Sequence, residues 1–95
     1  MPHTTEWKIR LQLTEDGDST KARAVLDTGT ASVTGTGAAR RAPGDADVPE
    51  IGDEFAAGRA LRDLGSRLLH TAQHDVEAHG SAPEPRTSPT SGWSL

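Results

Sequence analysis

The segment Arg40-Arg41-Ala42-Pro43-Gly44-Asp45-Ala46-Asp47-Val48-Pro49 separates two parts of the chain that have different hydrophobic periods. Before this segment, apolar residues recur at every second position, as they do in β-strands. After it, they recur about every 3.6 positions, as they do in an α-helix. The sequence therefore predicts strands up to Arg40 and one helix from Pro49 to about His79.

The first part predicts three short strands. In residues 7–13 every odd position is apolar and every even position is polar, which is typical of a half-buried strand. Turn-forming residues follow at 14–19, so the second strand, Thr20–Asp27, is expected to return antiparallel. A turn at residues 28–30 leads to the third strand, Ala31–Arg40. The inward side would carry Trp7 as a core residue, together with Ala22, Ala24 and Leu26.

The second part predicts a single amphipathic helix. At about 100° per residue, one arc of the helix is apolar and the opposite side is polar. The expected buried residues are Leu61, Leu64, Leu68, Ala72 and Val76, and the expected solvent-facing residues are Arg59, Asp63, Arg67, His70 and His74.

Four glycines suggest close packing of backbones. Gly35 and Gly37 share one face of the third strand, where glycine weakens a strand unless something packs against it. Gly58 and Gly65 lie two turns apart in the apolar arc of the helix, although each costs the helix about 1 kcal/mol relative to alanine. The facing surface would be either the glycine side of the third strand or the helix of a second subunit.

Length and composition predict one small domain. The fold class is α+β, a two-layer arrangement of a three-stranded antiparallel β-meander followed by one long C-terminal α-helix. This domain would span residues 1–79, and residues 80–95, which include Trp93 in a Gly-, Ser- and Pro-rich context, would form a disordered tail. A core of about eighty residues buries roughly 60% of the chain's surface, so a homodimer is expected to add stability.

The composition also points to a location. The chain has no cysteine, which excludes disulfides and thiolate chemistry. No basic stretch followed by an apolar run begins the chain, and no apolar run has the length of a membrane span. We therefore expect a cytoplasmic protein that does not enter a membrane.

Charge is distributed unevenly along the chain. The net charge is −4, yet residues 1–41 carry +1 and residues 42–79 carry −5. If the strand alternation is correct, four or five cations share the sheet face that points away from the helix: Lys8, Arg10, Lys21, Arg23 and Arg40. This face could be a solvated surface that blocks edge pairing, or it could bind RNA phosphate, an acidic protein surface or a second subunit.

No catalytic constellation is present. His70 and His74 have the i, i+4 spacing of metal ligands, but the His-Glu-x-x-His pattern is missing and the pair is expected on the solvent side. Gly35-x-Gly37 lies within a strand and lacks the third glycine of a dinucleotide-binding loop. We therefore expect a protein that is not an enzyme and that uses no metal or other cofactor.

Two stretches resemble a known family. They are Val33-Thr34-Gly35-Thr36-Gly37-Ala38-Ala39-Arg40-Arg41-Ala42-Pro43, and Asp47-Val48-Pro49-Glu50-Ile51-Gly52-Asp53-Glu54-Phe55 with the helix segments 59–64 and 67–69 that follow. Both are similar to the actinobacterial domain of unknown function 1876 family, also described as double-stranded-RNA-binding-domain-like. The resemblance covers about residues 7–77, and it departs from the family at Gly58 and Gly65, where alanine is expected.

The resemblance implies small β-β-β-α proteins, at least one of which is described as a dimer, with a proposed link to stress or dormancy through similarity to ribosome hibernation factors. It implies no catalytic residues. Three hypotheses remain, of which the first two are compatible and the last in rank is a small enzyme or metal protein that rests on His70 and His74. The first is a non-catalytic binding protein associated with the ribosome or structured RNA through the cationic sheet face. The second is a homodimeric structural or protein-interaction module without nucleic-acid binding.

Overall fold

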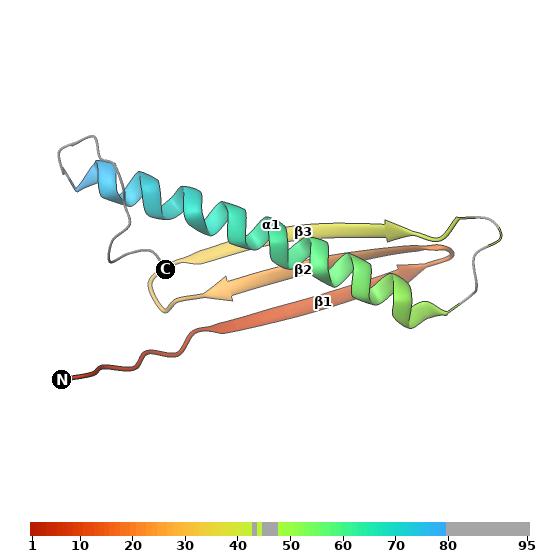
Figure 1. Cartoon of the computed structure of the whole chain (residues 1–95), viewed down its shortest axis with the longest axis horizontal. Helices are drawn as coiled ribbons and strands as arrows, with labels where there is room; N and C mark the ends of the chain where they lie inside the picture. Colours follow the sequence, from red (N-terminus) through yellow and green to blue (C-terminus); the bar gives the residue numbers. More distant parts are fainter. Residues whose placement is uncertain (43, 45–47, 80–95) are drawn as a thin grey trace.

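The computed structural model of the chain describes residues 1–42, 44 and 48–79. It contains β1 (Lys8–Asp16), β2 (Ser19–Asp27), β3 (Ser32–Arg40) and the helix α1 (Pro49–Ala78). The strands form one antiparallel sheet in the order β1-β2-β3, and α1 crosses one face of it (Figure 1). The prediction of an α+β fold with a three-stranded meander and one long C-terminal helix is confirmed. The expected tail, residues 80–95, lies outside the described residues.

The first hairpin is longer than predicted. β1 and β2 pair without interruption from Lys8 opposite Asp27 to Asp16 opposite Ser19. Only Gly17 and Asp18 lie between the strands, and Gly17 has a φ of +64°, a conformation that glycine adopts without steric cost. The predicted turn at residues 14–19 was therefore too long, because a two-residue turn allows residues 14–16 to continue the strand.

The core is thin because small residues fill most of it. Ala22, Ala24 and Leu26 of β2 meet Ala56, Ala60 and Leu64 of α1. Beside them, Gly35 and Gly37 of β3 lie directly under the helix backbone. A Cβ at Gly35 would come within 2.6 Å of the Ala60 carbonyl oxygen, and a Cβ at Gly37 within 2.5 Å of the Ala56 carbonyl oxygen. The absence of side chains at these two positions therefore lets α1 approach the sheet closely.

The buried side of α1 differs from the predicted arc. Ala56, Ala60 and Leu64 are buried, whereas Leu61 and Val76 are 43% and 52% exposed. Gly58 and Gly65, expected to mark a close contact, have no atom within 4 Å of an added Cβ in the described part of the chain. The prediction is confirmed for Leu64, and Leu68 packs against the core, but it was wrong for Leu61, Ala72 and Val76, which are exposed. Hydropathy ranks leucine above alanine, while the glycine face of β3 selects the helix side that allows the closest approach. A contact of Gly58 and Gly65 with the helix of a second subunit stays a prediction.

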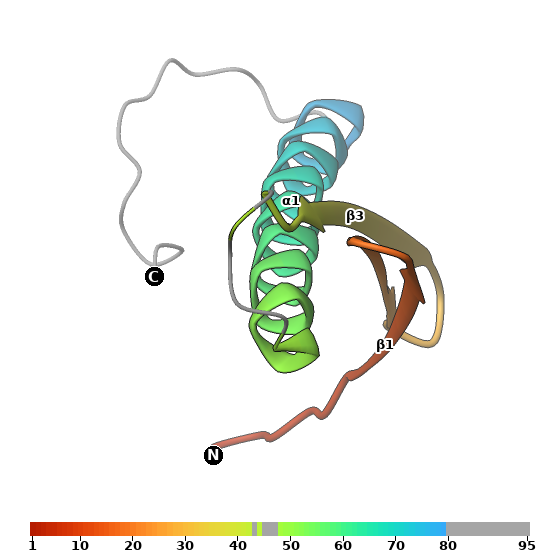
Figure 2. The ribbon, with the colours of Figure 1, turned by 90° about the vertical axis from the view of Figure 1, so that its right-hand side faces the viewer.

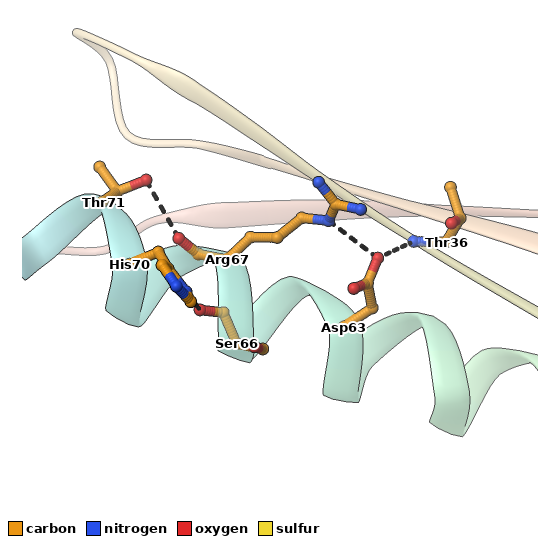
Figure 3. Close-up of polar contacts among 6 residues, drawn as sticks. All are labelled: Thr36, Asp63, Ser66, Arg67, His70 and Thr71. Carbon is orange, nitrogen blue, oxygen red and sulfur yellow. Dashed lines mark hydrogen bonds and ion pairs between the residues drawn. The ribbon is translucent and has the colours of Figure 1, made fainter.

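Polar residues of α1 cover the outer edge of β3. Thr36 N–H donates to Asp63 Oδ2 over 2.9 Å, and Arg67 Nε donates to the same oxygen over 2.9 Å (Figure 3). Arg59 Nη1 donates to the Ala38 carbonyl oxygen over 2.8 Å. These three side chains were expected in solvent, and Arg59 and Arg67 are indeed exposed while Asp63 is half-buried. They also contact main-chain groups of the edge strand or each other, because an edge strand has N–H and C=O groups that no strand satisfies.

The opposite strand, β1, is left largely uncovered. The helix packs on β3 and β2 and touches β1 only slightly, so every residue of β1 is exposed. Figure 2 shows α1 on one side of the sheet, and the N-terminal segment leads away from the sheet at β1. Trp7 is 50% exposed, so its prediction as a core residue was wrong. The reason is that α1 lies over the far edge of the sheet and contacts β1 only slightly, so it does not cover Trp7.

Candidate functional site

The face of the sheet that points away from α1, here called the outward face, carries the predicted cations. Along β2, residues 20, 22, 24 and 26 are buried under the helix, whereas Lys21 and Arg23 are exposed. Successive side chains of a strand point to opposite faces. Pairing then places Lys8 and Arg10 of β1 and Arg40 of β3 on the same outward face as Lys21 and Arg23.

The strand register brings three of these cations near the centre of the face. Arg23 lies between Gln12 of β1 and Thr36 of β3 in the same row of the sheet. Lys21 occupies the next row on β2, and Arg10 lies diagonally across from Arg23. Such diagonal neighbours in a sheet are about 7–8 Å apart, a distance within reach of long side chains.

A hollow of about 660 Å³ lies on this face. Its rim combines cationic side chains with hydroxyl and amide groups, which can donate hydrogen bonds to an anion. Gly37 and Ala22 contribute backbone atoms to the hollow, because their side-chain positions face α1 on the other side of the sheet. The lining residues are Gln12, Thr14, Lys21, Ala22, Arg23, Thr36, Gly37 and Ala38.

The charge balance of the outward face is positive at its centre. Its acidic residues, Asp16 and Asp27, occupy the ends of their strands. Within the described residues, neither Lys21 nor Arg23 forms an ion pair. Among the residues that the structure describes, no carboxylate lines the hollow, so none of them competes there with an anionic ligand.

Arg40 belongs to a different environment from the central cations. Its Nε lies 3.9 Å from Asp18 Oδ1, and its side chain is 78% exposed. It also lines a second hollow of about 330 Å³, between the β1–β2 turn and the start of α1, together with Glu15 and Phe55. This hollow mixes both signs of charge. Sequence reasoning did not find it, because it depends on how the start of the helix meets the hairpin turn.

Glu15, at the end of β1, faces the start of the helix. Hydrogen bonding with the Asp53 side chain, together with repulsion between the two carboxyl groups, raises the pKa of Glu15 above its ordinary value. In the described part of the chain, Asp53 Oδ1 is buried without a hydrogen-bond partner. When both carboxyl groups are ionised, their negative charges repel each other, and this repulsion weakens the contact between the hairpin and α1.

An exposed apolar surface lies on the other side of β1. The side chains of Ile9, Leu11 and Leu13 point to the side on which α1 lies, yet they are 51%, 37% and 41% exposed. On α1, Leu61 is also exposed, and Phe55 is 56% exposed with Arg59 Cζ 5.2 Å from its ring centroid. The glycines Gly58 and Gly65 face open space on the same helix. This surface is the second candidate for binding.

The histidine pair does not form a metal site with other side chains of the described residues. His70 Nδ1 lies 3.3 Å from the Ser66 carbonyl oxygen on the same helix (Figure 3). Within residues 1–42, 44 and 48–79, no three His, Asp or Glu side chains lie close enough together to hold a metal ion. In the same residues, no helix combines the length and apolar character needed to cross a membrane.

Comparisons with known proteins give one consistent family. Residues 5–85 match the Rv2632c-like family. The uncharacterised protein Mb1767 of Mycobacterium bovis is 43% identical over 72 residues, which are 76% of this chain and 77% of the relative. The uncharacterised protein Rv2632c of Mycobacterium tuberculosis is 37% identical over 76 residues, which are 80% of this chain and 82% of the relative.

A crystal structure of Rv2632c has the same fold. It is similar to this chain with a TM-score of 0.76 at 34% identity, over 86% of this chain and 98% of that chain. The sequence resemblance implied a small family of unknown function, and the uncharacterised relatives agree with that coarser statement. The double-stranded-RNA-binding-domain-like description stays a prediction.

Proposed function

The chain belongs to the Rv2632c-like family, and we propose that it is a non-catalytic protein that binds structured RNA, free or on the ribosome, through the outward face of its sheet. The observation that carries this proposal is the placement of Lys21 and Arg23 at one hollow, with Arg10 diagonally across from Arg23 on the same face and no ion pair formed by these three cations among the described residues. Phosphate groups are the ligands for which clustered cations with nearby hydroxyl groups are suited.

The form of the face favours duplex or folded RNA over single strands. Within residues 1–42, 44 and 48–79, no aromatic side chain lines the hollow, so bases have no ring on which to stack. Recognition would therefore rest on phosphate and 2′-hydroxyl groups, and it would depend on shape more than on sequence. The sequence resemblance adds the expectation that this binding serves stress or dormancy.

A binding titration with a fluorescently labelled RNA hairpin tests the proposal. Arg23→Gln should weaken binding and lower the slope of log K against log salt by about 1, since each phosphate contact contributes a slope of about that size. Arg62→Gln is the matched control, because Arg62 is exposed on α1. It should leave affinity and slope unchanged. Equal effects of the two substitutions, or no binding at about 50 mM salt, would contradict the proposal.

Sedimentation with ribosomes extends the same test. Lys8, Arg10, Lys21 and Arg23 changed together to Ser should remove co-sedimentation while circular dichroism stays unchanged, since all four side chains are exposed. Unaltered sedimentation of this variant would show that the outward face is not the contact with the ribosome.

A homodimer is the second candidate, and the exposed apolar surface favours it. Ile9, Leu11 and Leu13 on β1 and Leu61 on α1 would lose water contact against a second copy. Burial of apolar surface contributes about 25 cal/mol for each Å². The core of one chain consists mainly of alanine and buries little apolar surface, so burial against a second copy would add to its stability. Light scattering at micromolar concentration should then give twice the monomer mass, and a monomer would exclude this candidate.

A further inference from the structure

The two edges of the sheet differ in how much of their backbone is hydrogen-bonded by side chains of α1. At the β3 edge, Asp63 and Arg59 of α1 bind the main-chain groups of Thr36 and Ala38 that point away from β2. At the β1 edge, all nine residues are exposed and α1 barely reaches the strand. The molecule therefore has one closed edge and one open edge.

The bonding pattern identifies the groups that point out of the open edge. Because Thr36 N–H points away from β2, the neighbouring residues Gly35 and Gly37 exchange hydrogen bonds with β2. Their partners on β2, Ala24 and Ala22, therefore direct their N–H and C=O groups toward β3, and Arg23 between them directs its groups toward β1. Gln12 is the partner of Arg23 on β1, so the main-chain groups of Gln12 point toward β2. The N–H and C=O groups of Ile9, Leu11 and Leu13 consequently point into solvent, in position to pair with a further strand.

β1 lacks several of the devices that normally protect an exposed edge. Natural edge strands are shortened, bulged, interrupted by proline, given inward-pointing charges or lined with Lys and other charged side chains. β1 carries the last of these as Lys8 and Arg10, which oppose a basic strand but not an acidic one. β1 pairs with β2 over nine consecutive positions without a bulge, and it contains no proline. Its one charged residue on the helix side, Glu15, lies near the end of the strand. An edge of this length, on which Lys8 and Arg10 are the main protection, is suited to pairing with a strand that carries acidic residues.

The two sides of β1 specify what a further strand must carry. On the helix side, Ile9, Leu11 and Leu13 offer apolar neighbours. On the outward side, Lys8 and Arg10 offer positive charge at the edge itself. Directly opposed side chains stabilise a strand pair when both are apolar or when their charges are opposite. We infer that the open edge of β1 binds an extended partner segment in which apolar residues alternate with Asp or Glu.

Other occupants fit this edge less well. A second copy of β1 carries Asp16 as its one acidic residue on the outward side. In the antiparallel register that opposes Lys8 to Asp16, Arg10 lies opposite Thr14 and gains no acidic partner. The C-terminal residues of this chain contain Pro83, Pro85 and Pro89 and only one acidic residue. Proline cannot donate a ladder hydrogen bond, so that segment does not supply a continuous strand. The chemistry of the edge therefore favours a different protein.

Peptide binding to the full chain tests the inference without RNA, so its failure is distinct from failure of the RNA proposal. The probes are two capped seven-residue peptides, one alternating valine with glutamate and one alternating valine with lysine. Amide hydrogen exchange is followed by NMR at Ile9, Leu11 and Leu13. The glutamate peptide should slow exchange at these three amides, and it should bind more tightly by roughly two- to fivefold for each charge pair.

Two variants sharpen the test. Arg10→Glu should reverse the preference in favour of the lysine peptide, whereas Arg62→Glu on the exposed side of α1 should leave it unchanged. Leu11→Pro removes one edge donor, and proline is tolerated where the N–H faces solvent, so this variant should stay folded by circular dichroism and lose peptide protection.

Several results would overturn the inference. One is equal affinity for the two peptides with the unmodified chain. Another is binding that leaves the three amides exchanging as fast as before. A third is protection of these amides that rises with protein concentration and needs no peptide, which would assign the edge to a second copy.

Discussion

Oδ2 of Asp63 lies 2.9 Å from the main-chain nitrogen of Thr36, so a carboxylate in the middle of α1 accepts the hydrogen bond that a neighbouring strand would otherwise accept. The same oxygen accepts a hydrogen bond from Arg67 Nε. These contacts hold the pKa of Asp63 below its ordinary value, chiefly through the Thr36 N–H and then through Arg67. The position of the helix over β3 is therefore linked to pH.

Asp63→Asn should destabilise the protein at neutral pH and have a smaller effect in acid. Because the folded state lowers the pKa of Asp63, its contribution is present above the ordinary value of 3.8 and is lost as the pH falls through the lower folded-state pKa. Urea denaturation from pH 7 to pH 2.5 checks this. Asp75→Asn, at an exposed position of α1, should keep the pH profile of the unmodified chain. A constant difference between Asp63→Asn and the unmodified chain would contradict the linkage.

Glu15→Gln should have the opposite pH dependence. The folded state raises the pKa of Glu15 because of Asp53, so the favourable protonated form is fully present below 4.5 and is lost as the pH rises through the folded-state pKa. The glutamine variant should therefore be more stable than the unmodified chain at pH 7, with a gain that shrinks toward pH 4. Thermal unfolding measures both. Glu77→Gln, exposed near the end of α1, should show no such gain, and a loss of stability in Glu15→Gln would refute the argument.

Gly37→Ala should destabilise the fold, because the new Cβ would overlap the backbone of α1 near Ala56 and Arg59. Overpacking of this kind costs about 1–3 kcal/mol in the free energy of unfolding. Gly58→Ala is the matched change in open space, and it should stabilise the helix by about 1 kcal/mol. Urea denaturation of both variants gives the comparison. If they shift in the same direction, the close approach of helix and sheet is not the reason for glycine at position 37.

Leu61→Glu should convert a dimer into a monomer if a second copy covers the exposed apolar surface. Leu61 is 43% exposed in the single chain, so the glutamate should leave the fold intact while it introduces a charge into the interface. Arg62→Glu, one residue along and exposed, makes a comparable change outside that surface. Light scattering measures the mass of the two variants in solution. A Leu61→Glu protein that keeps the dimer mass of the unmodified protein would place the dimer contact elsewhere.

The strand half of the fold was predictable because apolar and polar residues alternate along a strand, and this alternation indicates which side of the strand is buried. The outward position of Lys21 and Arg23 follows from that alternation together with the antiparallel return of the chain. The helix was predictable as an element but its rotation was not. That rotation depends on the fit of Ala56 and Ala60 against Gly35 and Gly37. It also depends on the edge N–H and C=O groups of β3 that Asp63 and Arg59 bind. Neither effect is visible in hydropathy.

The candidate site was predictable to the same extent. Alternation alone identified the cations, but the hollow between Gln12 and Thr36 depends on the shape of the assembled sheet. Arg40 was grouped with the other cations by strand position, and the structure places it 3.9 Å from Asp18. That contact arises because the end of β3 passes the β1–β2 turn, where Arg41 N–H donates to the Asp18 carbonyl oxygen over 2.8 Å.

The asymmetry between the two edges also limits how large any assembly can become. A sheet with two open edges can recruit strands from both sides, and repeated recruitment leads to fibres. In this protein the side chains of Asp63 and Arg59 already occupy one edge. Strand addition to the sheet of this chain can therefore occur at β1 alone. Copies of the chain cannot be linked through both edges of their sheets, so the helix that forms the core also removes the two-sided recruitment on which fibres depend.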